Sequence, residues 1–142
     1  MNTRNIVIII VITAIFAAIA FTLFQREPEV KKVIITDSMD FSSDEEPEKI
    51  SGESSFGRDS DIFLVIFVKN IKKESIFGIK WAYIEKGSEI LLQEDSITVK
   101  NEGSGTISVS LAKKDGIHKP GSYKTEVIFD GVEPFINEFN IK

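Results

Sequence analysis

The chain has 142 residues, of which 42% are hydrophobic and 27% are charged, and its formal net charge at neutral pH is −5. It contains no cysteine, which excludes disulfide bonds, thiolate metal sites, thiol nucleophiles and a lipid-modified cysteine. The acidic balance argues against nucleic acid as a partner, because phosphate contacts need clustered Lys and Arg side chains.

The first predicted element is an apolar helix at residues 6–24, a run of nineteen residues without a charge, a Gly or a Pro. With a rise of about 1.5 Å per residue, this helix would be ~28 Å long, close to the ~30 Å hydrocarbon core of a bilayer. We therefore expect residues 1–26 to form a membrane anchor that contacts the lipid bilayer through residues 6–24. A cleaved signal peptide is the alternative, because Ala18 and Ala20 have the small-x-small spacing of a cleavage site.

The charges around this run bear on its orientation. Arg26, Lys31 and Lys32 follow the run, and counted alone they favour a cytoplasmic C-terminus. However, basic residues in a long folded domain influence orientation only weakly, and a short basic head with Arg4 is typical of exported proteins. We therefore expect a single-pass protein of the cell membrane with its C-terminal domain outside the cytoplasm. Beyond residue 26 the chain has 15 Lys and Arg and 22 Asp and Glu, a net charge of −7.

Residues 27–60 are expected to contain a first strand followed by an acidic loop or stalk. The β-branched run at 30–36 predicts the strand, and the Ser, Gly and acidic residues at 37–60 predict the loop or stalk. Several carboxylates could supply oxygen ligands to Ca²⁺: Asp37, Asp40, Asp44, Glu45, Glu46, Glu48, Asp59 and Asp61. Their spacing matches no EF-hand pattern, so a solvated loop is the expected state and no metal site is predicted.

Residues 61–142 are expected to form the main body of a β-sandwich. Residues 62–68 are apolar at successive positions, which is typical of a central strand buried on both faces. An aromatic alternation at 77–84 predicts the next strand. Further strands are indicated by two short apolar pieces at 90–92 and 97–99 and by alternating runs at 107–111, 123–129 and 135–141. Turn signals lie between them at 85–88, 119–122 and 130–131.

About seven short strands with regular turn signals predict an all-β fold, an immunoglobulin-like β-sandwich preceded by a single transmembrane helix. Trp81 would lie on the third strand, where immunoglobulin-type sandwiches bury a Trp between their sheets. Tyr123 begins the penultimate strand, at the position of a tyrosine corner, and Thr125 stands where antibody-type domains have their second Cys. No helical periodicity of useful length follows residue 26.

Several short motifs accompany this pattern: Phe56 with Asp59-Ser60-Asp61-Ile62-Phe63, then Trp81-Ala82-Tyr83, Pro120 to Val127, Asp130-Gly131 and Phe139-Asn140-Ile141. With these motifs, residues 30–142 resemble the small immunoglobulin-like accessory modules of prokaryotic exported and membrane-anchored proteins. The resemblance implies a fold. It implies no activity, because such modules have no common catalytic residues.

Three candidate sites have a structural explanation. His118, the only histidine, lies in a turn without obvious partners, and we expect a solvent-facing loop residue. The Gly103-Ser104-Gly105 segment lacks the Lys and the helix of a phosphate-binding loop, and we expect a hairpin loop. The aromatic residues could form a carbohydrate platform if exposed, but their alternation places them in the core. They are Phe77, Trp81, Tyr83, Phe129 and Phe139.

No catalytic, cofactor-binding or metal-binding residue is predicted, so the chain is not expected to be an enzyme. The favoured function is a non-catalytic, membrane-tethered binding or assembly module that acts outside the cytoplasm on an unidentified envelope protein or on itself. One alternative is a subunit of a surface filament or pilus-like appendage, with the apolar helix packed in its core. Another is an inhibitor or accessory subunit of an extracytoplasmic enzyme.

Overall fold

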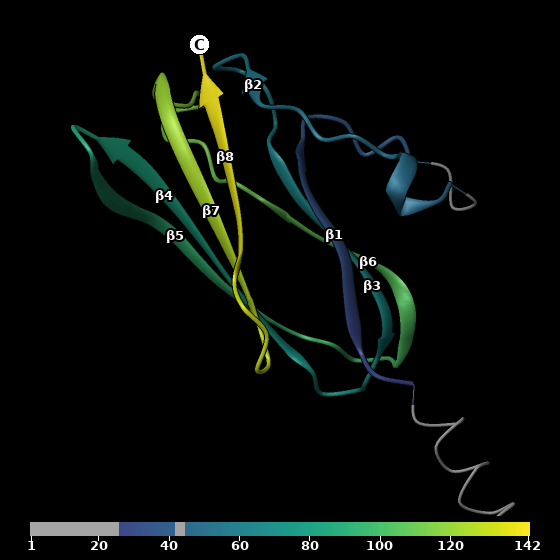
Figure 1. Cartoon of the computed structure of the whole chain (residues 1–142). Coiled ribbons are helices and arrows are strands. Elements are labelled where there is room, and N and C mark those ends of the chain that lie inside the picture. The colour runs from purple at the N-terminus through teal and green to yellow at the C-terminus, as the bar shows by residue number, and fades with distance from the viewer. Residues whose placement is uncertain (1–25, 42–44) are drawn as a thin grey trace, which may run out of the picture.

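The computed structural model describes residues 26–41 and 45–142, which form two β-sheets packed face to face (Figure 1). The elements in chain order are β1 (Glu29–Thr36), the short 3-10 helix η1 (Pro47–Lys49), β2 (Ser55–Phe56), β3 (Phe63–Ile71), β4 (Ile76–Glu85), β5 (Ser88–Thr98), β6 (Gly103–Ser110), β7 (Gly121–Phe129) and β8 (Phe135–Ile141). The predicted all-β sandwich is confirmed. The transmembrane helix predicted at 6–24 lies outside the described residues, and within the described ones no helix has the length and apolar character needed to cross a bilayer.

One sheet has the strand order β1-β3-β6 and the other the order β2-β8-β7-β4-β5. Adjacent strands are antiparallel, except that β2 pairs with β8 in parallel. The structure has one strand more than expected. The additional strand is β2, a two-residue strand inside the stretch predicted as a loop or stalk. The prediction of separate strands at 90–92 and 97–99 is wrong: residues 90–92, 97 and 98 belong to the single strand β5, which stays paired with β4 through its polar middle and ends at Thr98.

β3 is the central strand of the three-stranded sheet and is buried on both faces, as predicted for residues 62–68. Its inner face contributes Leu64 and Ile66 to the core between the sheets. Its outer face contributes Val65 and Phe67 to a second, smaller apolar cluster. The outer face is therefore also covered by protein.

The cover on this outer face comes from the segment between η1 and β2. Ile50 packs in the second cluster, and its carbonyl oxygen accepts a hydrogen bond from the Lys32 side chain. The Glu53 N–H donates to the carbonyl oxygen of Ile35, with a distance of 2.8 Å between nitrogen and oxygen. This segment is thus bound along the free side of β1.

The core between the sheets is aromatic. Trp81 is fully buried and meets the ring of Phe139 edge to face, with 6.3 Å between the ring centroids. Tyr123 stacks on the ring of Phe139, and its hydroxyl donates a 2.5 Å hydrogen bond to the carbonyl oxygen of Lys119. The predicted burial of Trp81 and the predicted corner contact of Tyr123 are both confirmed.

Candidate interaction surface

The candidate aromatic platform is part of the core. Phe77, Trp81, Phe129 and Phe139 are buried, as their alternation predicted. Tyr83 is half-buried at the end of the sandwich: its hydroxyl donates to the carbonyl oxygen of Pro120 at 3.0 Å, and the Lys119 ammonium lies 4.2 Å from the centre of its ring. These rings form no exposed stacking surface for a sugar.

The expectation of a solvent-facing His118 is wrong, because only 3% of this residue is exposed. Its backbone N–H donates to the carbonyl oxygen of Arg58 at 2.8 Å, and Arg58 Nε donates back to the carbonyl oxygen of His118 at 3.3 Å. These bonds hold the turn against the segment that leads into β3. Burial, followed by the Lys113 charge, lowers the pKa of His118, although a backbone hydrogen bond with Ser60 and the charge of Asp61 oppose this effect.

The depressed pKa of His118 predicts a loss of stability in mild acid. Between the lowered pKa of the folded state and the usual value near 6.5, the unfolded chain binds more protons than the folded chain, so acid favours unfolding. The free energy of unfolding should therefore fall as the pH drops from 7 to 5, which denaturant titrations at each pH would measure. His118→Asn should flatten this slope, and an unchanged slope would contradict the prediction.

The acidic residues that the structure describes are not gathered around a common point. Among residues 26–41 and 45–142, no three His, Asp or Glu side chains are grouped closely enough to hold a metal ion. Asp61 instead forms a 2.7 Å ion pair with Lys113, whose hydrogen bond and charge lower the pKa of its carboxyl group. Asp44 lies outside the described residues.

The glycine-rich segment is also placed differently from its prediction. Residues 103–105 are the first residues of β6, where Gly105 pairs with Val68, so the expected hairpin loop is wrong. An edge strand can contain such residues, because its backbone pairing with β3 does not require large side chains.

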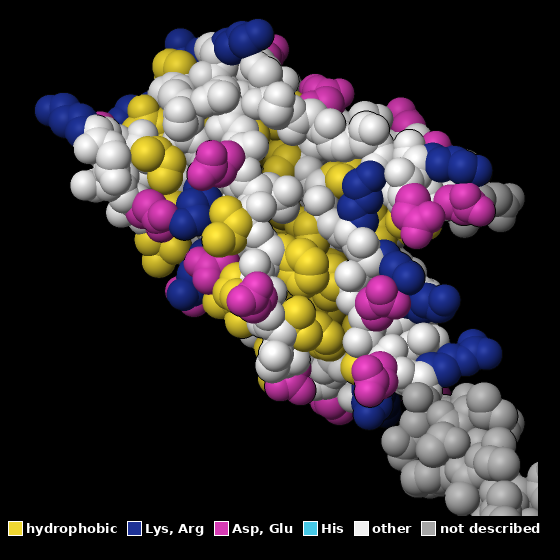
Figure 2. All heavy atoms as spheres, viewed as in Figure 1, with side chains coloured by type: hydrophobic (Ala, Val, Ile, Leu, Met, Phe, Trp, Pro, Cys, Tyr) yellow, Lys and Arg dark blue, Asp and Glu magenta, His cyan; other side chains and the backbone are white. Residues whose placement is uncertain are grey.

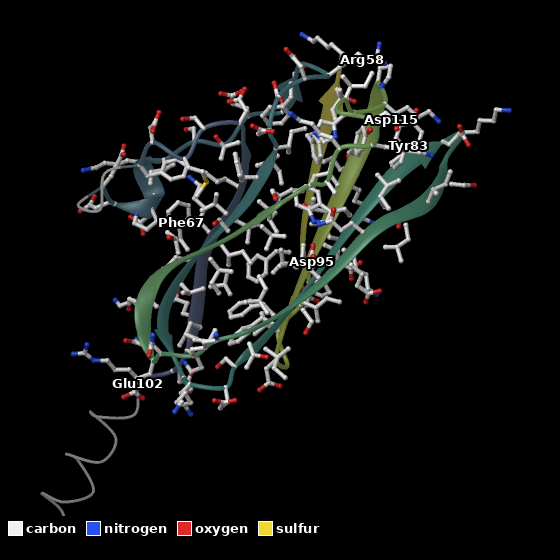
Figure 3. All side chains as sticks on the ribbon, turned by 180° about the vertical axis from the view of Figure 1, so that it is seen from behind. Arg58, Phe67, Tyr83, Asp95, Glu102 and Asp115 are labelled. Atoms are coloured by element: carbon white, nitrogen blue, oxygen red, sulfur yellow. The ribbon has the colours of Figure 1, made fainter. Side chains whose placement is uncertain are left out.

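Two edge strands, β5 and β6, border the same side of the sandwich. Figure 3 views this side, with Asp95 on β5 and the chain after β6 crossing toward Asp115. Gln93 of β5 joins the two edges: its Nε2 donates to the carbonyl oxygen of Ser110 at 3.0 Å, and its Oε1 accepts from the N–H of Ala112 at 2.9 Å. These two hydrogen bonds link β5 to the last residue of β6 and to the chain that follows it.

β5 presents an exposed apolar patch made of Ile90, Leu91 and Leu92, which are 42%, 57% and 48% exposed. A register shift opposite Trp81 and Ala82 interrupts the pairing at this point. Three successive apolar residues cannot all face the core of a regular strand, which was the sequence signal for this patch. Its role as a candidate surface was missed because the three residues were treated only as a strand indicator.

Leu91 also lines a shallow hollow of about 270 Å³ on the outer face of the five-stranded sheet. The other lining residues are Lys80, Ala82, Glu89, Lys124 and Glu126. Lys124 is paired with Glu89, which raises the pKa of its ammonium group. The hollow is thus apolar at the edge and charged with both signs toward the middle of the sheet.

A larger hollow, about 740 Å³, lies on the outer face of the three-stranded sheet. Its apolar lining includes Met39, Phe41 and Phe67, and the two aromatic rings meet edge to face at 6.0 Å. The segment 45–48 lies on one border and residues 104–106 of β6 on another. The covering segment therefore leaves open space next to the first half of β6.

The opposite side of the molecule, which Figure 2 shows, has hydrophobic side chains along the seam between β8 and β1. Val33 and Phe135 are partly buried residues that pack against the core from these two strands. On this face basic and acidic side chains are interspersed, without a large patch of one sign.

No protein-family model matches the chain, and no curated protein matches it either. Among solved structures, a Niemann-Pick type C2 protein from the Japanese carpenter ant is similar, with a TM-score of 0.44 and 14% sequence identity. The superposition covers 82% of this chain and 96% of the ant protein.

Proposed function

We propose that this chain is a non-catalytic, membrane-tethered module that binds an envelope partner outside the cytoplasm through the β5 edge of an immunoglobulin-like sandwich. The observation that carries the proposal is the exposed run Ile90, Leu91 and Leu92 on β5, an edge strand that pairs with β4 on one side only. Exposed apolar patches on soluble surfaces often mark interaction sites.

The strand order supports the immunoglobulin-like assignment. In immunoglobulin domains the first, second and fifth strands share one sheet, and the last two strands share the other with the third. Leaving the short β2 aside, this chain has β1, β3 and β6 together and β8, β7 and β4 together, with β5 beside β4. The tether is the apolar run at 6–24, which has the length of a membrane span.

An edge strand binds by adding a strand from another chain. The backbone N–H and C=O groups on the free side of β5 would provide affinity, and side chains such as Leu91 would provide selectivity. The shift in register next to Leu92 would restrict continuous pairing to one part of the strand. Such binding requires no catalytic residue, cofactor or metal.

The test is site-specific photo-cross-linking of the full-length chain in its native membranes. A photoreactive residue in place of Leu91 should give a discrete adduct with a second protein, and Leu91→Glu should abolish co-purification of that protein. Glu138, exposed on the outer face of β8 in the same sheet, is the matched control position and should give no adduct. Equal labelling at both positions, or a chain absent from the membrane fraction, would refute the proposal.

A further inference from the structure

Each sheet of the sandwich has two free edges. Two of these four edges are protected against further strand pairing, and pairing along a third, β5, is restricted to part of the strand. The free side of β1 is covered, since Ile35 accepts a hydrogen bond from Glu53. β2 has only two residues. β5 carries Glu89, Glu94 and Asp95 and a register shift. Short length, charged side chains, bulges and covering segments are the features by which proteins prevent unwanted edge pairing.

The fourth edge, β6, is protected only at its two ends, by a register shift between Val68 and Ile71 of β3 and by the hydrogen bond from Gln93 to Ser110. All eight of its residues, G-S-G-T-I-S-V-S, are uncharged, and none is proline. Its pairing with β3 is regular from Phe63 to Val68. Outer-face residues such as Thr106 and Ser108 are exposed, and the large hollow separates the covering segment from the start of this strand.

We propose that the occupant of the β6 edge is the β6 strand of a second copy of this chain, paired antiparallel about a two-fold axis at Ile107. This inference rests on the proposed function, in which the module binds through its edge strands. It identifies a second copy of the chain as one partner of the module. Two copies would join their three-stranded sheets into one continuous sheet. A shared membrane tether would raise the effective concentration of the two edges.

The register about Ile107 suits this pairing. Opposite residues of antiparallel strands point to the same face, so Ile107 would meet its own copy and Gly105 would meet Val109 on the inner face. Thr106 would meet Ser108 of the second copy on the outer face. No charged residue lies within β6, so a chain of net charge −5 could pair here without opposing like charges along the strand.

Cysteine cross-linking tests the register, because the chain has no cysteine of its own. Two differently tagged full-length chains, one with Thr106→Cys and the other with Ser108→Cys, should form a mixed disulfide in the membrane. Opposite residues such as Thr106 and Ser108 of the second copy have Cα atoms ~4.5–5.5 Å apart, within the range of a disulfide. Two copies of the same residue, such as Thr106 in both chains, would lie diagonally across the pair and ~7–8 Å apart. Mixed disulfides should therefore exceed same-position disulfides by about tenfold.

Ser96→Cys on β5 is the control, since this residue is also exposed on an edge strand of the same side. The Thr106→Cys chain could form disulfides with the Ser96→Cys chain as efficiently as with the Ser108→Cys chain. Such equal yields would overturn the proposal, because they would indicate random collision. The absence of any disulfide above that control would also overturn it.

A double substitution gives a second readout. Thr106→Lys combined with Ser108→Lys should weaken self-association by about tenfold or more, because lysines would face each other across the pair. Ser96→Lys with Thr98→Lys places the same charge on β5 and should leave association unchanged. Sedimentation of the full-length chains in detergent measures both, and equal effects would overturn the proposal.

The two proposals fail separately. A chain that stays monomeric but still gives an adduct at Leu91 would overturn the β6 pairing and support the proposed function. Mixed disulfides at β6 without any adduct at Leu91 would support the β6 pairing and refute the β5 partner.

Discussion

Replacing Trp81 by Ala is expected to lower the free energy of unfolding by about 3–5 kcal/mol, because a large buried ring is removed and leaves a cavity. Trp81 is completely buried, and its ring contacts Phe139 edge to face. Against the ~5–15 kcal/mol that stabilises a typical domain, this loss removes a large part of the total stability. Chemical denaturation followed by circular dichroism measures it.

Trp81→Phe is the matched control. The indole Nε1 has no hydrogen-bond partner among the described residues, so this change keeps an aromatic ring against Phe139 and removes an unpaired N–H. It should cost less than about 1.5 kcal/mol. Trp81 is the only tryptophan, and its fluorescence should be blue-shifted and poorly quenched by acrylamide. Free quenching would contradict its place in the core.

Gly121→Val should destabilise the domain by roughly 2–4 kcal/mol through strain and collision together. Gly121 has φ +140°, and a Cβ atom there would lie 2.5 Å from the hydroxyl oxygen of Tyr83. Tyr83 cannot easily move, because its hydroxyl is bonded to Pro120 and its ring packs edge to face on Tyr123. Thermal and denaturant unfolding would measure the loss.

Gly87→Val separates the two causes. Gly87 also has a positive φ, +79°, but a Cβ atom there would have nothing within 4 Å. Its substitution should cost only the backbone strain, about 1–2 kcal/mol. Equal losses at the two glycines would show that the contact with Tyr83 contributes nothing.

The sequence correctly predicted those strands whose burial can be read from the order of apolar and polar residues within the strand itself. The alternation at 123–129 and 135–141 corresponds to β7 and β8, and the continuous apolar run at 62–68 corresponds to a strand buried on both faces. Trp81 was predicted correctly because it lies in such an alternation. A period of two reports directly on which side chains face the core.

The features that were missed depend on distant parts of the chain. β2 exists because Phe56 pairs with Ile141, and a two-residue strand leaves no local pattern. His118 is buried because its backbone bonds to Arg58, which is sixty residues earlier. The exposed row on β5 and the open edge of β6 depend on which strands lie beside them. Strand order is a property of the whole sandwich, and turn signals do not encode it.

The path of β1 has a mechanical consequence. The described chain begins at one end of the sandwich and its C-terminus lies at the other (Figure 1). Tension applied between residue 26 and Lys142 would pull β1 along its own direction, against the seven residue pairs that join it to β3. The hydrogen bonds of this ladder would be loaded in shear and share the force, whereas a strand peeled from its end would release them one at a time.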